Sequence, residues 1–89
     1  DGTYWVEGAC YAFSADEIDV LEAATDTLHR LCLEACAHVV ERGRFAELAI
    51  PAAFHERVAA SWNAREPTLY GRFDLAWDGS GAPKMLEYN

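Results

Sequence analysis

The last twenty residues of the chain hold the clearest set of side chains for chemistry: Arg72, Asp74, Glu87 and Asn89. They lie in two alternating stretches, separated by a turn-forming segment at residues 78–83 that is rich in glycine. Such a pattern predicts an antiparallel hairpin. With Asp78 opposite Pro83, the register pairs Asp74 with Glu87. It also pairs the arginine with the asparagine and residue 76 with residue 85.

This register gives the hairpin two different faces. Phe73, Leu75 and Leu86 would face the rest of the protein, and the four polar side chains would share the other face. A slip of one residue would scatter the polar set and bury charge, so the hydrophobic pattern itself favours this pairing.

Two directly opposed carboxylates destabilise a sheet unless something relieves their repulsion. One carboxyl group could retain a proton, Arg72 could lean between them, or a divalent cation could lie in the gap. Two carboxylates and an amide carbonyl are hard oxygen ligands suited to Mg²⁺, and an adjacent guanidinium could bind a phosphate or a carboxylate. A solvated hairpin face neutralised by its arginine is the simpler alternative, and spacing alone leaves both readings open.

Composition restricts the remaining possibilities. The 89 residues are 52% hydrophobic and carry a formal net charge of −8 with only seven basic residues, which favours one small globular domain and argues against nucleic-acid binding. No apolar run is long enough to cross a membrane, and no signal peptide is recognisable. Three cysteines do not form a disulfide framework, so we expect a cytoplasmic protein. Because the chain starts without Met and ends within a patterned segment, we expect a piece of a longer protein.

The elements that must position the hairpin are two helices and an extended arm. Residues 1–13 are rich in aromatic residues and predict a strand or an arm packed on them. Ser14 and Glu17 form a capping box, Phe13 and Ile18 a hydrophobic staple, and Gly43 a terminator, which together predict a helix over 15–42. Its buried face is predicted to contain Ile18, Leu21, Thr25, Leu28, Cys32, Ala35 and Val39.

A second, shorter helix is predicted over 51–64, with Pro51 at its first position and Phe54, Val58 and Trp62 as its apolar stripe. The hairpin then occupies 69–89. The fold class is therefore α+β: a long N-terminal helix, a second shorter helix and a C-terminal antiparallel β-hairpin in a single partial domain, 1–89.

Other reactive side chains are more readily explained by packing. His29, Cys32 and Cys36 fall at helical spacings, but small thiols on a helix face are common packing residues, and a structural zinc site needs a fourth ligand. His38 and His55 are expected on helix surfaces, and neither Ser61 nor Cys10 has a paired base at a recognisable spacing. The tryptophans and tyrosines are expected in the core or at an interface.

Nearly the whole chain resembles the glutathionylspermidine synthase family, whose synthetase part is an ATP-grasp-type ligase. The resemblance rests on "YW.E...Y.F" from Tyr4, on "EIDVLEAATDTLHRLCLEA" at 17–35, on Ile50-Pro51 and Ser61-Trp62, and above all on "LYGRFDLAWDG" and "PKMLEYN". It implies an enzyme that activates a carboxylate of glutathione with ATP as an acyl phosphate, from which an amine of spermidine displaces phosphate.

Carried over residue by residue, the resemblance implies that Asp74, Glu87 and Asn89 are Mg²⁺ ligands. Arg72, Phe73 and Asp74 are implied to bind the nucleotide, and Arg72 to contact the transferred phosphoryl group as the catalytic residue. The glycine-rich loop, the adenine pocket and the amidase domain of some members are not found in these 89 residues.

We therefore expect an isolated chain that is inactive. We also expect apolar surface that can drive self-association. The alternative function is a small acidic interaction module without catalysis.

Overall fold

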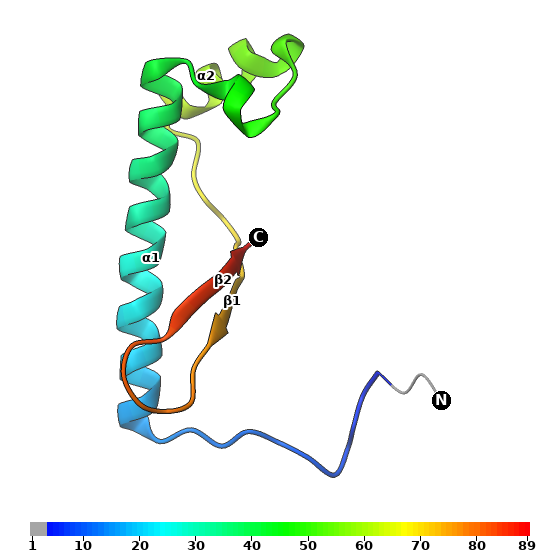
Figure 1. Ribbon diagram of the computed structural model, residues 1–89, viewed down its shortest axis with the longest axis vertical. Helices are drawn as coiled ribbons and strands as arrows, with labels where there is room; N and C mark the ends of the chain where they lie inside the picture. The colour runs from blue at the N-terminus through cyan, green and yellow to red at the C-terminus, as the bar shows by residue number, and fades with distance from the viewer. Residues whose placement is uncertain (1–3) are drawn as a thin grey trace.

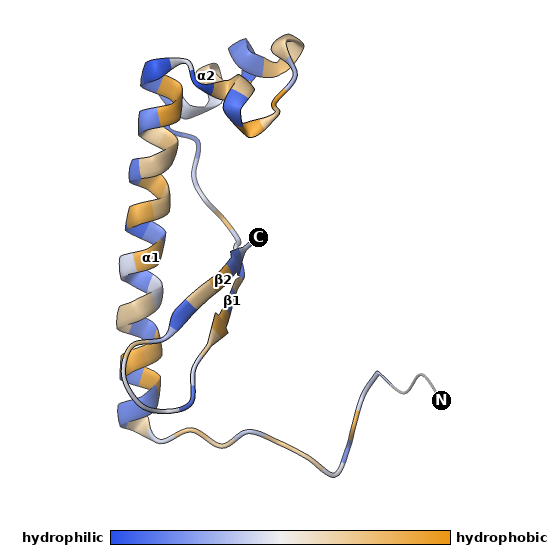
Figure 2. Ribbon diagram, viewed as in Figure 1, coloured by the Kyte–Doolittle hydropathy of each residue, from blue (hydrophilic) through white to orange (hydrophobic). Residues whose placement is uncertain are grey.

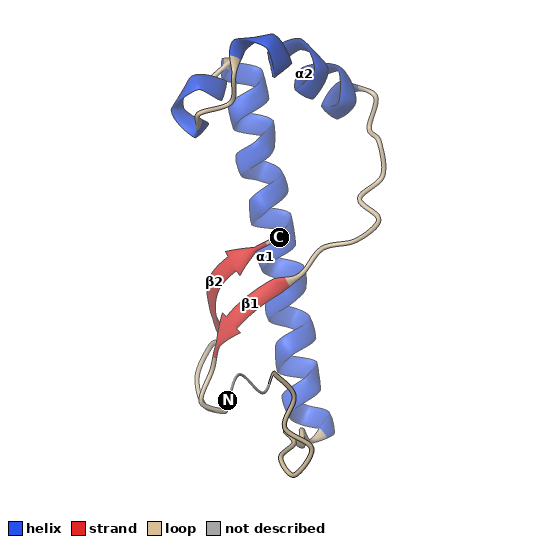
Figure 3. Cartoon of the chain, turned by 90° about the vertical axis from the view of Figure 1, so that its right-hand side faces the viewer, coloured by secondary structure: helices blue, strands red, loops and turns tan. Residues whose placement is uncertain are grey.

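The computed structural model describes residues 4–89. It contains the expected two α-helices and antiparallel hairpin, with two short 3-10 turns between the helices. The long helix α1 (Ala15–Arg42) forms the spine. The hairpin lies along its N-terminal half, and helix α2 (His55–Asn63) lies across its C-terminal end (Figure 1; Figure 3 gives the view turned by 90°). The α+β assignment is thereby confirmed.

Helix α1 begins and ends where its capping residues require. The Ser14 hydroxyl accepts from the backbone N–H of Glu17, and the Glu17 carboxylate accepts from the N–H of Ser14, so the capping box is complete. At the other end Gly43 adopts a left-handed conformation with φ of 61°, which ends the helix. Figure 2 shows apolar residues recurring along α1 between polar ones.

The predicted buried face of α1 is only half-covered. Leu21, Thr25, Leu28, Cys32 and Val39 are partly shielded, whereas Ile18 and Ala35 are exposed. No residue of α1 is fully buried. The hairpin and α2 cover parts of this stripe, so the periodicity identified the correct face but not the depth of its burial.

The second helix is shorter than the sequence suggested. Instead of starting at Pro51, the chain forms 3-10 turns at Phe45–Leu48 and Ala52–Phe54 before α2 begins at His55. Pro51 directly precedes the second turn with an extended backbone, ψ 141°. The first turn places Phe45 beneath α2, and at 6% exposure it is the one buried hydrophobic side chain within residues 4–89.

The hairpin consists of β1 (Phe73–Ala76) and β2 (Lys84–Tyr88). The pairs Phe73–Tyr88 and Asp74–Glu87 match the expected register, but the next pairs are Leu75–Met85 and Ala76–Lys84. A β-bulge leaves Leu86 as the extra residue, so the predicted pairing of residues 76 and 85 is wrong. The connecting loop, 77–83, is longer than the four residues expected.

The bulge also corrects the assignment of faces. Met85, not Leu86, is the partner of Leu75, and Leu86 is 70% exposed. An inserted residue displaces the alternation by one position, and a pattern of period two cannot reveal where that happens.

Residues 4–13 form an extended arm without a strand, and the arm projects away from α1 (Figure 1). Residues 1–3 of the expected arm lie outside the described residues. Tyr4 and Trp5 contact each other edge to face at 4.9 Å, yet they remain 84% and 80% exposed. Of the two expected locations, a core and an interface, the described residues provide no core around these arm aromatics.

The described chain is open. Its Cα radius of gyration is 17.5 Å, whereas a compact domain of this length has about 12 Å. Its accessible surface is 7686 Å², against about 5200 Å² for a compact monomer of this mass. None of the helices in residues 4–89 is both long and apolar enough to cross a membrane.

Candidate functional site

The hairpin brings the four predicted polar residues together as two cross-strand pairs. Arg72 and Asn89 exchange two backbone hydrogen bonds, each 2.8 Å from nitrogen to oxygen, just beyond the ends of the strands. Two residues along, Asp74 lies opposite Glu87. Because side chains alternate along a strand, residues 72, 74, 87 and 89 share one face of the hairpin. We call this set the polar face.

The repulsion between the two acids is relieved in part by the arginine. Arg72 Nε lies 3.4 Å from Asp74 Oδ1, with the two side chains 65% and 44% exposed. An ion pair this exposed contributes only about 0–1 kcal/mol. The guanidinium is therefore held loosely enough to exchange its partner for an anionic ligand.

The donor atoms of the polar face suit a hard cation. Asp74 and Glu87 supply carboxylate oxygens and Asn89 an amide oxygen, which is the ligand chemistry of Mg²⁺. No group of three His, Cys, Asp or Glu side chains in residues 4–89 could hold a metal ion. A Mg²⁺ site here accordingly needs the amide and further oxygens from water or phosphate, as Mg²⁺ sites usually do.

Phe73 lies on the opposite face, where it stacks on Tyr88 with ring centroids 3.9 Å apart and an interplanar angle of 24°. The family resemblance implied that Phe73 binds the nucleotide together with Arg72 and Asp74. The structure stacks its ring on Tyr88, away from the polar face.

The same face carries a contact that was not predicted from the sequence. The Tyr88 hydroxyl is 2.9 Å from Nδ1 of His29, which projects from the middle of α1. Gly71 lies so close that a Cβ there would be 2.6 Å from Tyr88 Cε1. A glycine in an otherwise regular strand pattern is a signal of close approach, and it could have pointed to this contact.

The bulge lies directly beside the polar face, between Met85 and Glu87. Bulges increase the local twist of a strand pair and are frequent next to active sites, where they redirect side chains. Glu87 and Asn89 share a face with Asp74, as they would in a regular register, and the bulge pairs Met85 with Leu75 on the other face.

The connecting loop is fixed by its own side chains. The Asp78 carboxylate accepts hydrogen bonds from the backbone N–H and the hydroxyl of Ser80, both 2.9 Å, and these bonds lower the pKa of Asp78. Trp77 Nε1 donates to the carbonyl of Gly81 at 3.1 Å. The loop thereby closes the hairpin at the end away from the polar face.

The remaining candidates make local contacts. His55, expected on the surface, is half-buried; it stacks on Phe45 and Nε2 lies 2.7 Å from the carbonyl oxygen of Ile50. His38 is exposed and contacts Arg44, and the Ser61 hydroxyl donates to Glu66. The cysteines at positions 10, 32 and 36 are free thiols.

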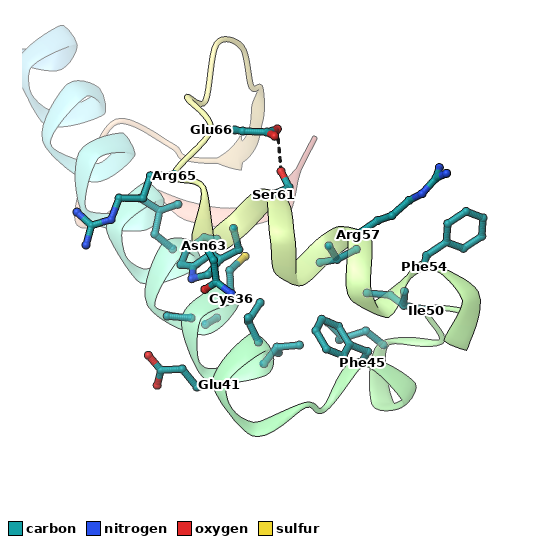
Figure 4. A pocket seen from close by; sticks show the side chains of 18 of the residues that line it. Cys36, Glu41, Phe45, Ile50, Phe54, Arg57, Ser61, Asn63, Arg65 and Glu66 are labelled. Atoms are coloured by element: carbon teal, nitrogen blue, oxygen red, sulfur yellow. Dashed lines mark hydrogen bonds between the residues drawn. The ribbon is translucent and has the colours of Figure 1, made fainter.

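An apolar groove lies between the C-terminal part of α1 and α2 (Figure 4). It has a volume of about 1120 Å³, and none of the polar-face residues lines it. Its apolar lining includes Val40, Phe45, Leu48, Ile50, Val58 and Trp62. This groove is thus separate from the polar face.

Comparison with known proteins supplies a family. The model of the family described as "Glutathionylspermidine synthase preATP-grasp" matches residues 1–89. A Haemophilus influenzae protein named "Putative acid--amine ligase" is 38% identical over 90 residues, covering all of this chain and 23% of the relative. The Crithidia fasciculata glutathionylspermidine synthase is 34% identical over 89 residues, covering 94% of this chain and 12% of that protein. No solved structure matches the chain.

Proposed function

Because the chain belongs to the glutathionylspermidine synthase preATP-grasp family, we propose that it is part of an ATP-dependent ligase that joins a carboxylate to an amine. The chain spans less than a quarter of the length of the two relatives described above. The contribution we assign to it is the polar face, as part of the site for magnesium and the nucleotide phosphates.

In this proposal Asp74, Glu87 and Asn89 hold Mg²⁺ through their side-chain oxygens. The bound ion would neutralise charge on phosphate oxygens, as metal ions do in phosphoryl transfer. The chain's own part is to keep three oxygen donors on one rigid surface. The paired backbone bonds of Arg72 and Asn89 support this, because they fix the strand ends that carry the donors.

Arg72 is the proposed catalytic residue. Its guanidinium presents a planar fork that can contact the transferred phosphoryl group and the carboxylate under activation. It must leave Asp74 to do so, and the exposure of that ion pair makes the exchange inexpensive in free energy. Asp74 would then be available to the metal.

The proposed reaction has two steps. A carboxylate oxygen attacks the γ-phosphorus of ATP and releases ADP, which leaves an acyl phosphate; the amine then attacks the acyl carbon, loses a proton and expels phosphate. The proposed substrates are glutathione and spermidine, which the names of the family and of the Crithidia fasciculata relative support. The nucleotide and the cytoplasmic location also belong to this proposal.

The observation that carries the proposal is the pairing of Asp74 with Glu87 beside Arg72 and Asn89. The test is Mg²⁺-dependent formation of ADP by the full-length polypeptide that contains these residues, with candidate acids and amines. Arg72→Ala should lower kcat about 10²–10³-fold, the usual cost of removing one preorganised donor. Glu87→Gln should abolish measurable turnover.

Two matched variants act as controls. Arg30→Ala and Glu22→Gln change the same residue types at exposed positions of α1, and both should leave turnover unchanged. Turnover near the wild-type value in Arg72→Ala and Glu87→Gln would refute the assigned roles.

A small acidic interaction module is the second candidate, and the apolar groove beside α2 favours it. That function would be indifferent to the polar face. A polypeptide without Mg²⁺-dependent ATP turnover under any pairing of acid and amine would support the module and end the ligase proposal.

A further inference from the structure

Tyr88 occupies a special place in the hairpin because its two neighbours in sequence are the proposed metal ligands Glu87 and Asn89. It is the last residue of β2. Since side chains alternate along a strand, Tyr88 points away from the polar face while its neighbours belong to it. Any shift of the Tyr88 main chain must therefore move both ligands.

The Tyr88 ring is tightly enclosed. Arg72 and Asn89 form a hydrogen-bonded pair, so the adjacent pair, Phe73 and Tyr88, is of the non-hydrogen-bonded kind, in which side chains lie closest. Its rings stack at 3.9 Å. A Cβ on Gly71 would lie 2.8 Å from the Tyr88 oxygen and 2.6 Å from Cε1, so the ring passes directly over that glycine.

The Tyr88 hydroxyl connects the hairpin to the long helix. It lies 2.9 Å from Nδ1 of His29, and the two rings meet edge to face with centroids 6.0 Å apart. Both residues are half-buried. Across residues 4–89, this is the one side-chain hydrogen bond between the hairpin and α1.

The contact lies at the end of β2 that pairs with the start of β1. A two-stranded sheet is marginally stable alone and gains stability by packing against a helix. Here a side-chain hydrogen bond joins that end of β2 to the 28-residue helix α1. The same end carries the acidic and amide donors of the polar face.

We propose that Tyr88 and His29 are positioning residues: their hydrogen bond sets the depth of the β2 end against α1 and thereby holds Glu87 and Asn89 in place for Mg²⁺. The inference rests on the proposed function. Neither residue touches the metal or the substrates. Their effect should therefore appear in the apparent affinity for Mg²⁺ and leave the KM of the amine unchanged. A general loss of folded protein would not change the Mg²⁺ affinity selectively.

The central experiment measures two quantities on the full-length polypeptide: the Kd of MgATP by isothermal titration without acid or amine, and the Mg²⁺ dependence of ATP turnover. Tyr88→Phe removes only the hydroxyl and keeps the ring on Phe73. Loss of one net hydrogen bond predicts that the Kd and the half-saturating Mg²⁺ concentration each rise about threefold to tenfold. Tyr70→Phe makes the same chemical change at a tyrosine that is 88% exposed, and it should leave the Mg²⁺ dependence unchanged.

Variants of His29 complete the test. His29→Leu should reproduce the effect of Tyr88→Phe, and the double variant should be no worse than either single one, because both remove the same bond. His29→Asn places a polar group near the position of Nδ1 and should restore most of the Mg²⁺ affinity.

The possible failures are distinguishable. A wild-type polypeptide without Mg²⁺-dependent turnover overturns the proposed function and this inference with it. Normal Mg²⁺ dependence in wild type together with an unchanged Tyr88→Phe variant overturns the inference alone. Additive effects in the double variant do the same, since independent contributions would mean that the two side chains do not act through one contact.

Discussion

Replacing Gly71 with alanine is the sharpest test of how the hairpin is packed. The added Cβ would lie 2.6, 2.8 and 3.1 Å from three atoms of the Tyr88 side chain. Contacts under 3 Å force something to move, and the ring is enclosed by Phe73 and bonded to His29. The substitution should therefore displace Tyr88 and break its hydrogen bond. The φ of Gly71 lies outside the left-handed range, so the backbone itself tolerates alanine.

The magnitude follows from three terms. Inserting a methyl group into a packed site costs about 1–3 kcal/mol, and losing the Tyr88–His29 hydrogen bond adds about 0.5–1.5 kcal/mol. Alanine also restricts the unfolded chain more than glycine does, which stabilises the folded state by about 0.4–1 kcal/mol. The sum is a destabilisation of the hairpin of about 2 kcal/mol.

Amide hydrogen exchange measures this locally, whatever the length of the surrounding polypeptide. The N–H groups of Arg72 and Asn89 donate to each other's carbonyl groups, so their exchange reports opening of the hairpin. Since about 1.4 kcal/mol corresponds to a factor of ten, exchange at both amides should become about thirtyfold faster in Gly71→Ala.

Gly8→Ala is the matched control, because nothing lies within 4 Å of a Cβ at that position and its φ also lies outside the left-handed range. It should leave exchange in the hairpin unchanged. In a Tyr88→Ala background the clash is absent, and Gly71→Ala should no longer accelerate exchange. Equal exchange in Gly71→Ala and Gly8→Ala would refute the packing described for Tyr88.

Three further predictions follow from other parts of the chain. Folding lowers the pKa of Asp78, so its hydrogen bonds should stabilise the loop at pH values above the ordinary aspartate pKa of about 3.9. The loop should lose this stabilisation as pH falls through the lower pKa of the folded state. Ser80→Ala should move the NMR titration of Asp78 part of the way back, since the backbone bond remains. Gly43→Ala should destabilise the end of α1 by about 1–2 kcal/mol in hydrogen exchange, because φ is 61° there. The isolated chain should self-associate with rising concentration in sedimentation experiments, and Val58→Glu in the groove should reduce this; a monomer at all concentrations would contradict that prediction.

Local signals predicted local structure well. The capping box at Ser14 and the glycine at position 43 involve interactions within one turn of the chain, and α1 ends where they indicate. The alternation of the last twenty residues likewise gave the hairpin, and its hydrophobic pattern paired Asp74 with Glu87. These features need no knowledge of distant residues.

Features that depend on distant residues were not accessible in this way. The contact between Tyr88 and His29 joins residues 59 positions apart, and no periodicity relates them. The bulge at Leu86 shifts the pairing by one residue, and a pattern of period two does not show where such a shift falls. Residues 52–54 form a 3-10 turn instead of the first turn of α2, and Phe45 is buried against His55 at the start of that helix.

For the same reason, the sequence could not show which large hydrophobic residues are covered. Hydrophobicity predicts that a residue favours burial, but burial needs a partner surface. Tyr4, Tyr11 and Leu69 remain 84–92% exposed within the described chain. In the ligase we propose, such apolar surfaces would be available to the rest of the polypeptide.

The most direct test of the central claim is to measure binding of MgATP to the full-length polypeptide by isothermal titration calorimetry, without acid or amine. Even outer partners of metal ligands change metal affinity about 10–100-fold, so Asp74→Asn and Glu87→Gln should each weaken MgATP at least tenfold. The same exchanges at the exposed residues Asp19 and Glu22 of α1 should leave it unaltered. If the hairpin variants bind MgATP as tightly as the helix variants, the polar face does not hold the magnesium-bound nucleotide.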